Sequence, residues 1–122
     1  MSKKILVIDD DENVLEVIQM LLSQAGYEVF TSVTGKDIFD LIHDCHPHVI
    51  LLDILLGELN GKDLCRAVKS HPETSHIPVI IVSSLQNIYN TIVDEGANDI
   101  ISKPFTEEIL LARVQRQLPT AC

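Results

Sequence analysis

Five polar residues follow or interrupt apolar stretches of this sequence, and their types suit phosphoryl chemistry. Asp9 and Asp10 follow the first apolar stretch, Asp53 interrupts a later one, and Ser83 and Lys103 come after two more. An aspartate inside an apolar strand is costly to bury unless it has a role there. A carboxylate can attack phosphorus, and an ammonium group with a metal ion can neutralise phosphoryl charge. We therefore expect Asp53 to be the nucleophile, with Ser83 and Lys103 placed to contact the phosphoryl oxygens.

The three aspartates also predict a metal site. Two unit charges about 4 Å apart repel by roughly 4 kcal/mol at an effective dielectric of 20. If folding gathers Asp9, Asp10 and Asp53, the cluster must protonate, spread apart or bind a cation. An all-oxygen site with open positions suits Mg²⁺, which keeps several waters and shares its shell with phosphate. A phosphoryl group would then complete the coordination.

Regularly alternating strand and helix patterns must position these residues. Short apolar runs predict strands, and apolar residues at helical spacing between them predict helices. The expected strands are residues 5–9, 27–33, 49–56, 78–83 and 99–102. The expected helices begin at the cap Asp11, near Ile38, at Gly61, at Ile88 and at the cap Thr106.

This alternation predicts an α/β fold with a five-stranded parallel sheet covered on both faces. Right-handed crossovers favour the doubly wound, flavodoxin-like (βα)5 arrangement with strand order 2-1-3-4-5. Ligands of such sheets bind beyond the carboxyl ends of the strands, where the order reverses. Here that point lies between the strands that end in Asp9–Asp10 and Asp53. With 122 residues, 46% of them hydrophobic, we expect one domain over residues 1–119 and a tail or linker start at 120–122.

Composition argues against several classes of partner and location. The net charge of −9, without a basic cluster, disfavours nucleic acid. The first apolar stretch is too short for a signal peptide or a membrane span. Three widely spaced cysteines, Cys45, Cys65 and Cys122, indicate neither a disulfide framework nor a zinc site. We expect a cytoplasmic protein in a reducing compartment, away from the membrane.

A second group of metal-ligand types is His43, Cys45, His46 and His48. Its spacing straddles a helix end, Pro47 and a strand start, so the side chains should diverge. A solvated surface is the preferred interpretation, and a soft-metal site is the alternative.

The chain resembles the receiver domains of two-component response regulators from Lys3 to about Leu118. The resemblance rests on several motifs, in order and at receiver-like spacing: Ile-Leu-Val-Ile-Asp-Asp (5–10), Leu-Leu-Asp (51–53), Gly61, Pro-Val-Ile-Ile-Val-Ser (78–83), Gly-Ala (96–97) and Lys-Pro-Phe (103–105). It implies phosphoryl transfer to Asp53 from a histidine kinase or a histidine phosphotransfer protein. It also implies that the chain catalyses nothing beyond its own phosphorylation and dephosphorylation.

The resemblance further implies a ligand set for Mg²⁺ or Mn²⁺. Asp10 and Asp53 would bind directly, Asp9 largely through water, and Leu55 through its main-chain carbonyl. Lys103 would pair with Asp53 or its phosphoryl group, and the Lys103–Pro104 peptide would be cis. The last two helices would contact an effector domain or a second copy of the chain.

The sequence departs from the receiver pattern at several positions. Gly57 replaces the usual proline after the acceptor, which should loosen that loop. Ile100 stands where receivers usually have an aromatic switch residue, and it has no ring to swing inward as Ser83 moves. Apolar Leu55 and Leu85 flank the site, from which we predict slow loss of the phosphoryl group. The stretch from Ser83 to Gly96 is also shorter than in many receivers, so we expect its helix to be short or displaced.

Two alternatives remain at the sequence level. The run ending in Asp9-Asp10-Asp11 resembles that of a haloacid-dehalogenase-like phosphatase, with Asp9 as nucleophile and Asp11 as acid/base. Against it, Asn13 replaces the expected Thr or Val, and no late acidic pair follows. The other alternative is a pseudo-receiver, a binding module that keeps the fold without the phosphorylation.

Overall fold

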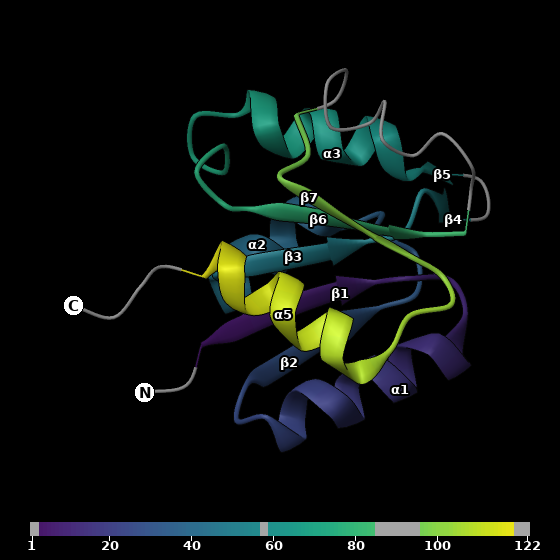
Figure 1. Cartoon of the computed structure of the whole chain (residues 1–122). Coiled ribbons are helices and arrows are strands. Elements are labelled where there is room, and N and C mark those ends of the chain that lie inside the picture. The colour runs from purple at the N-terminus through teal and green to yellow at the C-terminus, as the bar shows by residue number, and fades with distance from the viewer. Residues whose placement is uncertain (1–2, 57–58, 85–95, 119–122) are drawn as a thin grey trace.

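Five parallel strands form the central sheet (Figure 1). The computed structural model describes residues 3–56, 59–84 and 96–118. The strands of the central sheet are β1 (Lys4–Ile8), β2 (Glu28–Ser32), β3 (Val49–Leu52), β6 (Val79–Ser83) and β7 (Asp99–Ser102). They lie in the order β2-β1-β3-β6-β7 with every neighbouring pair parallel. Counted along the chain this is the predicted order 2-1-3-4-5, and the flavodoxin-like fold is confirmed.

Helices cover both faces of this sheet, as Figure 1 shows. The four described helices are α1 (Glu12–Gln24), α2 (Ile38–Cys45), α3 (Gly61–Ser70) and α5 (Glu107–Gln117). Strand β1 alternates between the faces: Leu6 and Ile8 join the core with α2 and α3, while Ile5 and Val7 join the core with α1 and α5. Burial on both faces explains why the central strands are continuously apolar in sequence.

Side-chain caps begin three of the helices. Asp11 accepts hydrogen bonds from the main-chain N–H groups of Asn13 and Val14 at the start of α1, and Thr106 accepts one from Ile109 at the start of α5. Both caps were predicted from sequence. Helix α3 begins at Gly61 as expected, with Asn60 as its cap.

The apolar run at 49–56 was predicted as one strand, and that prediction is wrong. Strand β3 ends at Leu52, and Leu55–Leu56 forms a separate strand, β4, antiparallel to β5 (Leu59–Asn60). Leu52 is the last β3 residue in register with both Ile8 and Ile81. Strand β1 ends at Ile8 while β6 continues to Ser83, and the backbone of Leu55–Leu56 takes its hydrogen-bond partners from the local hairpin instead.

Further expectations lie outside the described residues, namely the helix predicted at 88–95, the loop at Gly57, the role of Leu85 and the tail at 120–122. In the part of the chain that the structure describes, no helix has the length and apolar character needed to cross a bilayer.

Candidate functional site

The ends of β1 and β3 place Asp9 and Asp53 side by side. The main-chain N–H of Asp53 donates to the carbonyl of Ile8 over 2.9 Å, which extends the pairing of the two strands by one residue. On the other side of β1, the N–H of Asp9 donates to the carbonyl of Ser32 over 3.1 Å. The backbone of each aspartate is therefore held by the sheet itself.

The neighbouring strands bring Ser83 and Lys103 to the same edge. Ser83 is the last residue of β6, is 1% exposed, and lies in register with Ser102 of β7. The next N–H, that of Lys103, donates to the carbonyl of Ser83 over 3.0 Å. The Lys103–Pro104 peptide is cis, as predicted.

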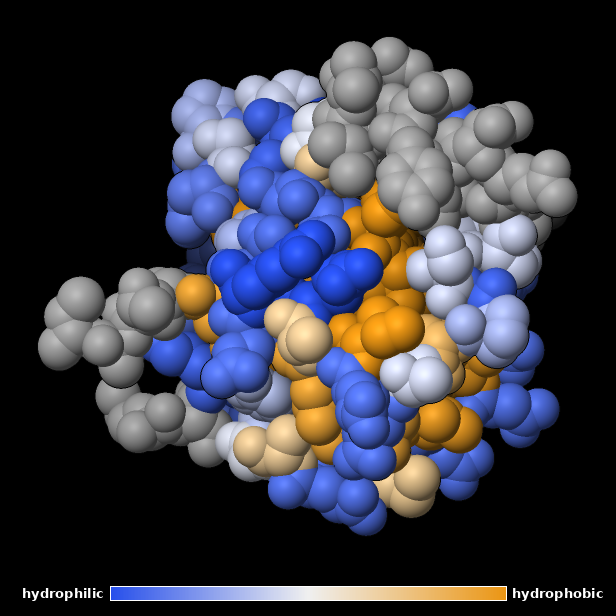
Figure 2. Space-filling view, viewed as in Figure 1, coloured by the Kyte–Doolittle hydropathy of each residue, from blue (hydrophilic) through white to orange (hydrophobic). Residues whose placement is uncertain are grey.

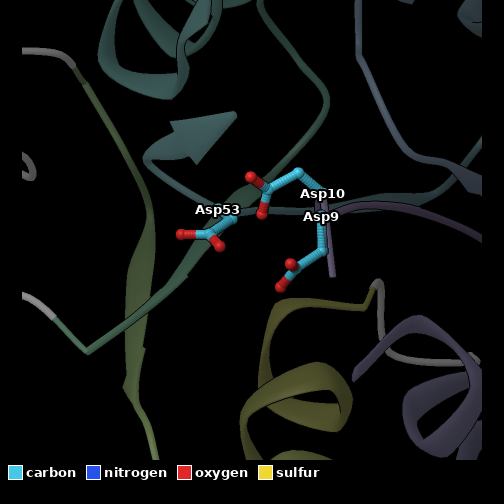
Figure 3. A group of neighbouring side chains, drawn as sticks. All are labelled: Asp9, Asp10 and Asp53. Atoms are coloured by element: carbon cyan, nitrogen blue, oxygen red, sulfur yellow. The ribbon is translucent and has the colours of Figure 1, made fainter. Parts of the chain in front are cut away.

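Three carboxylates gather at this edge, as Figure 3 shows. Asp9, Asp10 and Asp53 each offer an oxygen, and these oxygens all lie within 4.8 Å of one another. Asp9 is 2% exposed and Asp53 is 5% exposed, whereas Asp10 is exposed to solvent. We call these three residues the acidic cluster.

The ammonium group of Lys103 bridges the two buried members of the acidic cluster. Its Nζ lies 2.8 Å from Oδ2 of Asp9 and 3.0 Å from Oδ2 of Asp53. Burial alone would lower the pKa of Lys103, but the hydrogen bonds to the two carboxylates outweigh it and raise that pKa. The lysine is therefore held firmly in its charged form.

For Asp9, in contrast to Lys103, the charged form is disfavoured. Burial raises its pKa, and the nearby charge of Asp53 adds to that effect. Hydrogen bonds from Lys103 and from the N–H of Asp11, the latter 2.9 Å from Oδ1, oppose the rise without cancelling it. One lysine therefore compensates the three carboxylates incompletely, and an additional cation would relieve the remaining repulsion.

The donor set fits Mg²⁺. It consists of hard carboxylate oxygens, two of them buried and one facing water, so that open positions remain for water or phosphate. Both oxygens of Asp9 already accept hydrogen bonds, which accords with its expected action through water. Leu55 lies in β4, two residues beyond Asp53, and its main-chain carbonyl stays a predicted ligand.

Gly61 supports the backbone of the acidic cluster through a close approach. Its N–H donates to the carbonyl of Ile54 over 2.7 Å. A Cβ atom at position 61 would lie 2.0 Å from the carbonyl oxygen of Asp53 and 2.7 Å from the Cα of Ile54. A residue with a side chain cannot sit there without moving the backbone of Asp53. The sequence motif included Gly61, but this reason for it is visible in the structure alone.

Ile100, the predicted substitute for an aromatic switch residue, is buried. It is 7% exposed, lies in register with Ile81 of β6, and belongs to the core shared with α2 and α3. Its role in switching stays a prediction.

The comparisons with known proteins agree with this geometry. A family model described as the response regulator receiver domain matches residues 5–115. The chain belongs to this family. This membership, rather than the haloacid-dehalogenase resemblance, accounts for the acidic strand end, and Asp11 serves as the cap of α1.

Solved structures of receiver domains are similar over nearly the whole chain. The receiver domain of NtrX from Brucella abortus is 30% identical, with a TM-score of 0.84 and coverage of 96% of this chain and 99% of that one. Chemotaxis protein CheY4 of Vibrio cholerae is 25% identical, with a TM-score of 0.89 and coverage of 97% and 100%.

A third similar structure is longer than this chain. The response regulator DrrB from Thermotoga maritima is 36% identical, with a TM-score of 0.81. The match covers 95% of this chain but 52% of that one. A receiver domain can thus occupy about half of a response regulator.

Proposed function

We propose that this receiver domain accepts a phosphoryl group on Asp53 in a magnesium-dependent reaction and thereby switches a protein interaction. The observation that carries the proposal is the acidic cluster, bridged by Lys103 and left with excess negative charge. The donor would be a phosphohistidine on a histidine kinase or a phosphotransfer protein in the cytoplasm.

Asp53, Lys103 and Ser83 have different roles in the transfer. A carboxylate oxygen of Asp53 forms the bond to phosphorus while the bond to the donor imidazole nitrogen breaks, and that nitrogen keeps the electron pair. Lys103 turns from the Asp53 carboxylate to the phosphoryl oxygens, which carry the charge in the transition state. The Ser83 hydroxyl donates to a phosphoryl oxygen. The chain catalyses its own phosphorylation and dephosphorylation and acts on no other substrate.

Asp10 and Asp53 would hold Mg²⁺ or Mn²⁺ directly, with the carbonyl of Leu55 as a further ligand and Asp9 acting largely through water. When bound, the ion supplies positive charge that stabilises the phosphoryl oxygens in transit.

An apolar groove beside the acidic cluster supports docking of a phosphodonor protein. The groove encloses about 480 Å³ between the start of α1 and the segment that leads from β7 into α5. It is lined by Asn13, Val14, Val17, Ser84, Lys103, Pro104 and Phe105. Figure 2 shows hydrophobic surface next to strongly hydrophilic surface on the face that carries α5. The expected effector or homodimer contacts would use α5 and the helix predicted at 88–95.

The test is labelling with a phosphoramidate or acyl phosphate in the presence of Mg²⁺, followed by intact-mass measurement. We expect a mass increase of one phosphoryl group that disappears with Asp53→Asn or with a chelator. Asp63→Asn, which removes an exposed carboxylate on α3, is the matched control and should label normally.

The same experiment separates the alternatives. Absence of both labelling and Mg²⁺-dependent beryllofluoride binding in the wild type would leave a pseudo-receiver. Repeated hydrolysis of a small phosphate ester that requires Asp9 but not Asp53 would favour a phosphatase and overturn the proposal.

A further inference from the structure

A second group of ligand-type side chains lies at the end of the sheet opposite to the acidic cluster. All five histidines of the chain fall near the amino ends of β3 and β6: His43, His46, His48, His71 and His76. Two neighbouring hollows open there, one of about 240 Å³ and one of about 410 Å³. Both are lined in part by Ile42, His46 and Glu73.

The sequence predicted that the clustered side chains around residue 45 would diverge, and the structure bears this out for two of them. Cys45 is buried, and His48 accepts a hydrogen bond at Nδ1 from the N–H of Lys4 over 3.0 Å. The side chains of His43 and His46, in contrast, lie near each other at the surface. Their ring centres lie 6.1 Å apart, and both side chains are exposed.

The backbone of His46 contributes to this pairing. His46 follows the last residue of α2 with φ 50° and ψ 61°, a left-handed conformation that few residues with a side chain adopt. This turn places His46 beside His43, three residues earlier. Two imidazoles that share a Zn²⁺ through bonds of about 2.0–2.1 Å have ring centres roughly 5–6 Å apart. The observed separation is close to that value.

Glu73 brings a carboxylate to the same hollow from a distant part of the chain. It lies between α3 and β6, is exposed, and lines the smaller hollow together with His43 and His46. In the part of the chain described, these ligand atoms are not gathered as closely as those of the acidic cluster. All three side chains are exposed, however, so core packing does not fix their rotamers.

We propose that His43, His46 and Glu73 form a binding site for a divalent transition-metal ion, best suited to Zn²⁺. Two imidazoles and one carboxylate are a zinc ligand set that leaves a position open for water. The partial negative charge at the carboxyl end of α2 and the net charge of −9 also favour a cation there. Because imidazole is a softer ligand than carboxylate, this site and the acidic cluster should select different ions.

Occupation would join the end of α2 to the segment between α3 and β6. Binding to the folded chain alone raises its thermal stability in proportion to the logarithm of free ion concentration. Zn²⁺ should therefore raise the Tm in a manner that depends on His43, His46 and Glu73.

The test is calorimetric titration of the full chain with Zn²⁺ in excess Mg²⁺, the ion proposed for the acidic cluster. Cys122→Ser in every variant removes a competing thiol. We expect one Zn²⁺ per chain and a weakening of roughly 100-fold or more on loss of one ligand, exceeding the roughly 10–100-fold effect of second-shell changes. The variants are His43→Ala, Glu73→Gln and His46→Asn, and asparagine tolerates the left-handed backbone.

Three controls define the site. Asp10→Asn should leave Zn²⁺ binding unchanged, as should His76→Asn, which alters the larger hollow alone, and Asp44→Asn on α2. Absence of Zn²⁺ binding by the parent chain, retention of affinity in all three ligand variants, or loss of affinity in Asp10→Asn or His76→Asn would overturn the assignment.

Discussion

Buried carboxylates occur at both ends of the central sheet, and their partners differ. Asp99 opens β7 and is 4% exposed, nearly as buried as Asp9 and Asp53 at the opposite ends of β1 and β3. Arg116 binds both oxygens of Asp99, with Nε 2.6 Å from Oδ2 and Nη2 2.7 Å from Oδ1. Asp99 therefore has a two-point partner of its own.

Further donors surround Asp99, among them Arg113, whose Nε lies 3.7 Å from Oδ1. The Nε2 of Gln117 lies 3.0 Å from Oδ2, and the N–H of Ile100 lies 3.0 Å from Oδ1. Burial would raise the pKa of Asp99, but hydrogen bonds from Arg116, Gln117 and Ile100 lower it on balance. The charged form is thus the favoured form.

In the acidic cluster, the effect of burial on the pKa of Asp9 outweighs that of the hydrogen-bond donors. Lys103 is shared between Asp9 and Asp53, with Asp10 close by, and the pKa of Asp9 stays raised. Desolvation acts on both regions in the same direction, so the number and geometry of the donors decide the outcome. A fully paired carboxylate stabilises the fold, whereas an incompletely paired group retains the capacity to bind a cation and a phosphoryl group.

The largest effect is expected from Gly61→Ala, which displaces the backbone of the acidic cluster and leaves Asp99 unchanged. Gly61→Ala introduces a Cβ 2.0 Å from the carbonyl oxygen of Asp53, so the backbone there must move. We expect a loss of about 3 kcal/mol in the free energy of unfolding, together with most of the labelling at Asp53. Urea unfolding and intact-mass labelling measure both, with Lys62→Ala as the control. Normal stability and labelling in Gly61→Ala would show that the close approach has no role.

The next largest effect is expected from a change at Asp99, which leaves the acidic cluster intact. Asp99→Ala leaves the buried N–H of Ile100 without its side-chain acceptor, which costs about 1–3 kcal/mol of unfolding free energy. Labelling of Asp53 by a small phosphodonor should stay near the wild-type yield once the protein is folded. Loss of labelling in a folded Asp99→Ala protein would contradict the separation of the two regions.

A smaller change of opposite sign is expected for Asp9→Asn. Removing one of the incompletely compensated charges should raise the free energy of unfolding by roughly 1 kcal/mol when divalent ions are chelated. Mg²⁺ should stabilise the wild type more than the variant, because the wild type has more charge to neutralise. Urea unfolding of both proteins, first with chelator and then with Mg²⁺, measures the stability difference and the stabilisation by Mg²⁺. Destabilisation of Asp9→Asn in chelator would mean that Lys103 already compensates the cluster.

The smallest effect concerns pH. Since the folded pKa of Asp99 lies below its ordinary value of 3.8, its contribution to stability is present above that value and is lost as pH falls through the folded pKa. The stability difference between the wild type and Asp99→Asn should therefore be constant near neutral pH and shrink below about pH 3.8. Unfolding curves at a series of acidic pH values measure it. A difference that grows on acidification would reverse the sign assigned to Asp99.

Sequence patterns alone were enough to predict the sheet and the acidic cluster. Hydrophobic periodicity identified the five strands of the central sheet and the caps Asp11 and Thr106, because these depend on local spacing and side-chain chemistry. Connection rules then put the strand ends that carry Asp9 and Asp53 next to each other, since few arrangements of βαβ units exist.

Tertiary structure decided what depends on contacts between distant segments. Strand β3 ends at Leu52, level with the end of β1 at Ile8, and the chain then forms the β4–β5 hairpin; an apolar run does not reveal this. The approach of Gly61 to Asp53, the pairing of Asp99 with Arg116, and the hollow lined by His43, His46 and Glu73 bring together residues that no periodic pattern relates. The sequence by itself determined which elements form and which ends they share, because these follow from local spacing. Distances and charge balance were decided by packing in three dimensions.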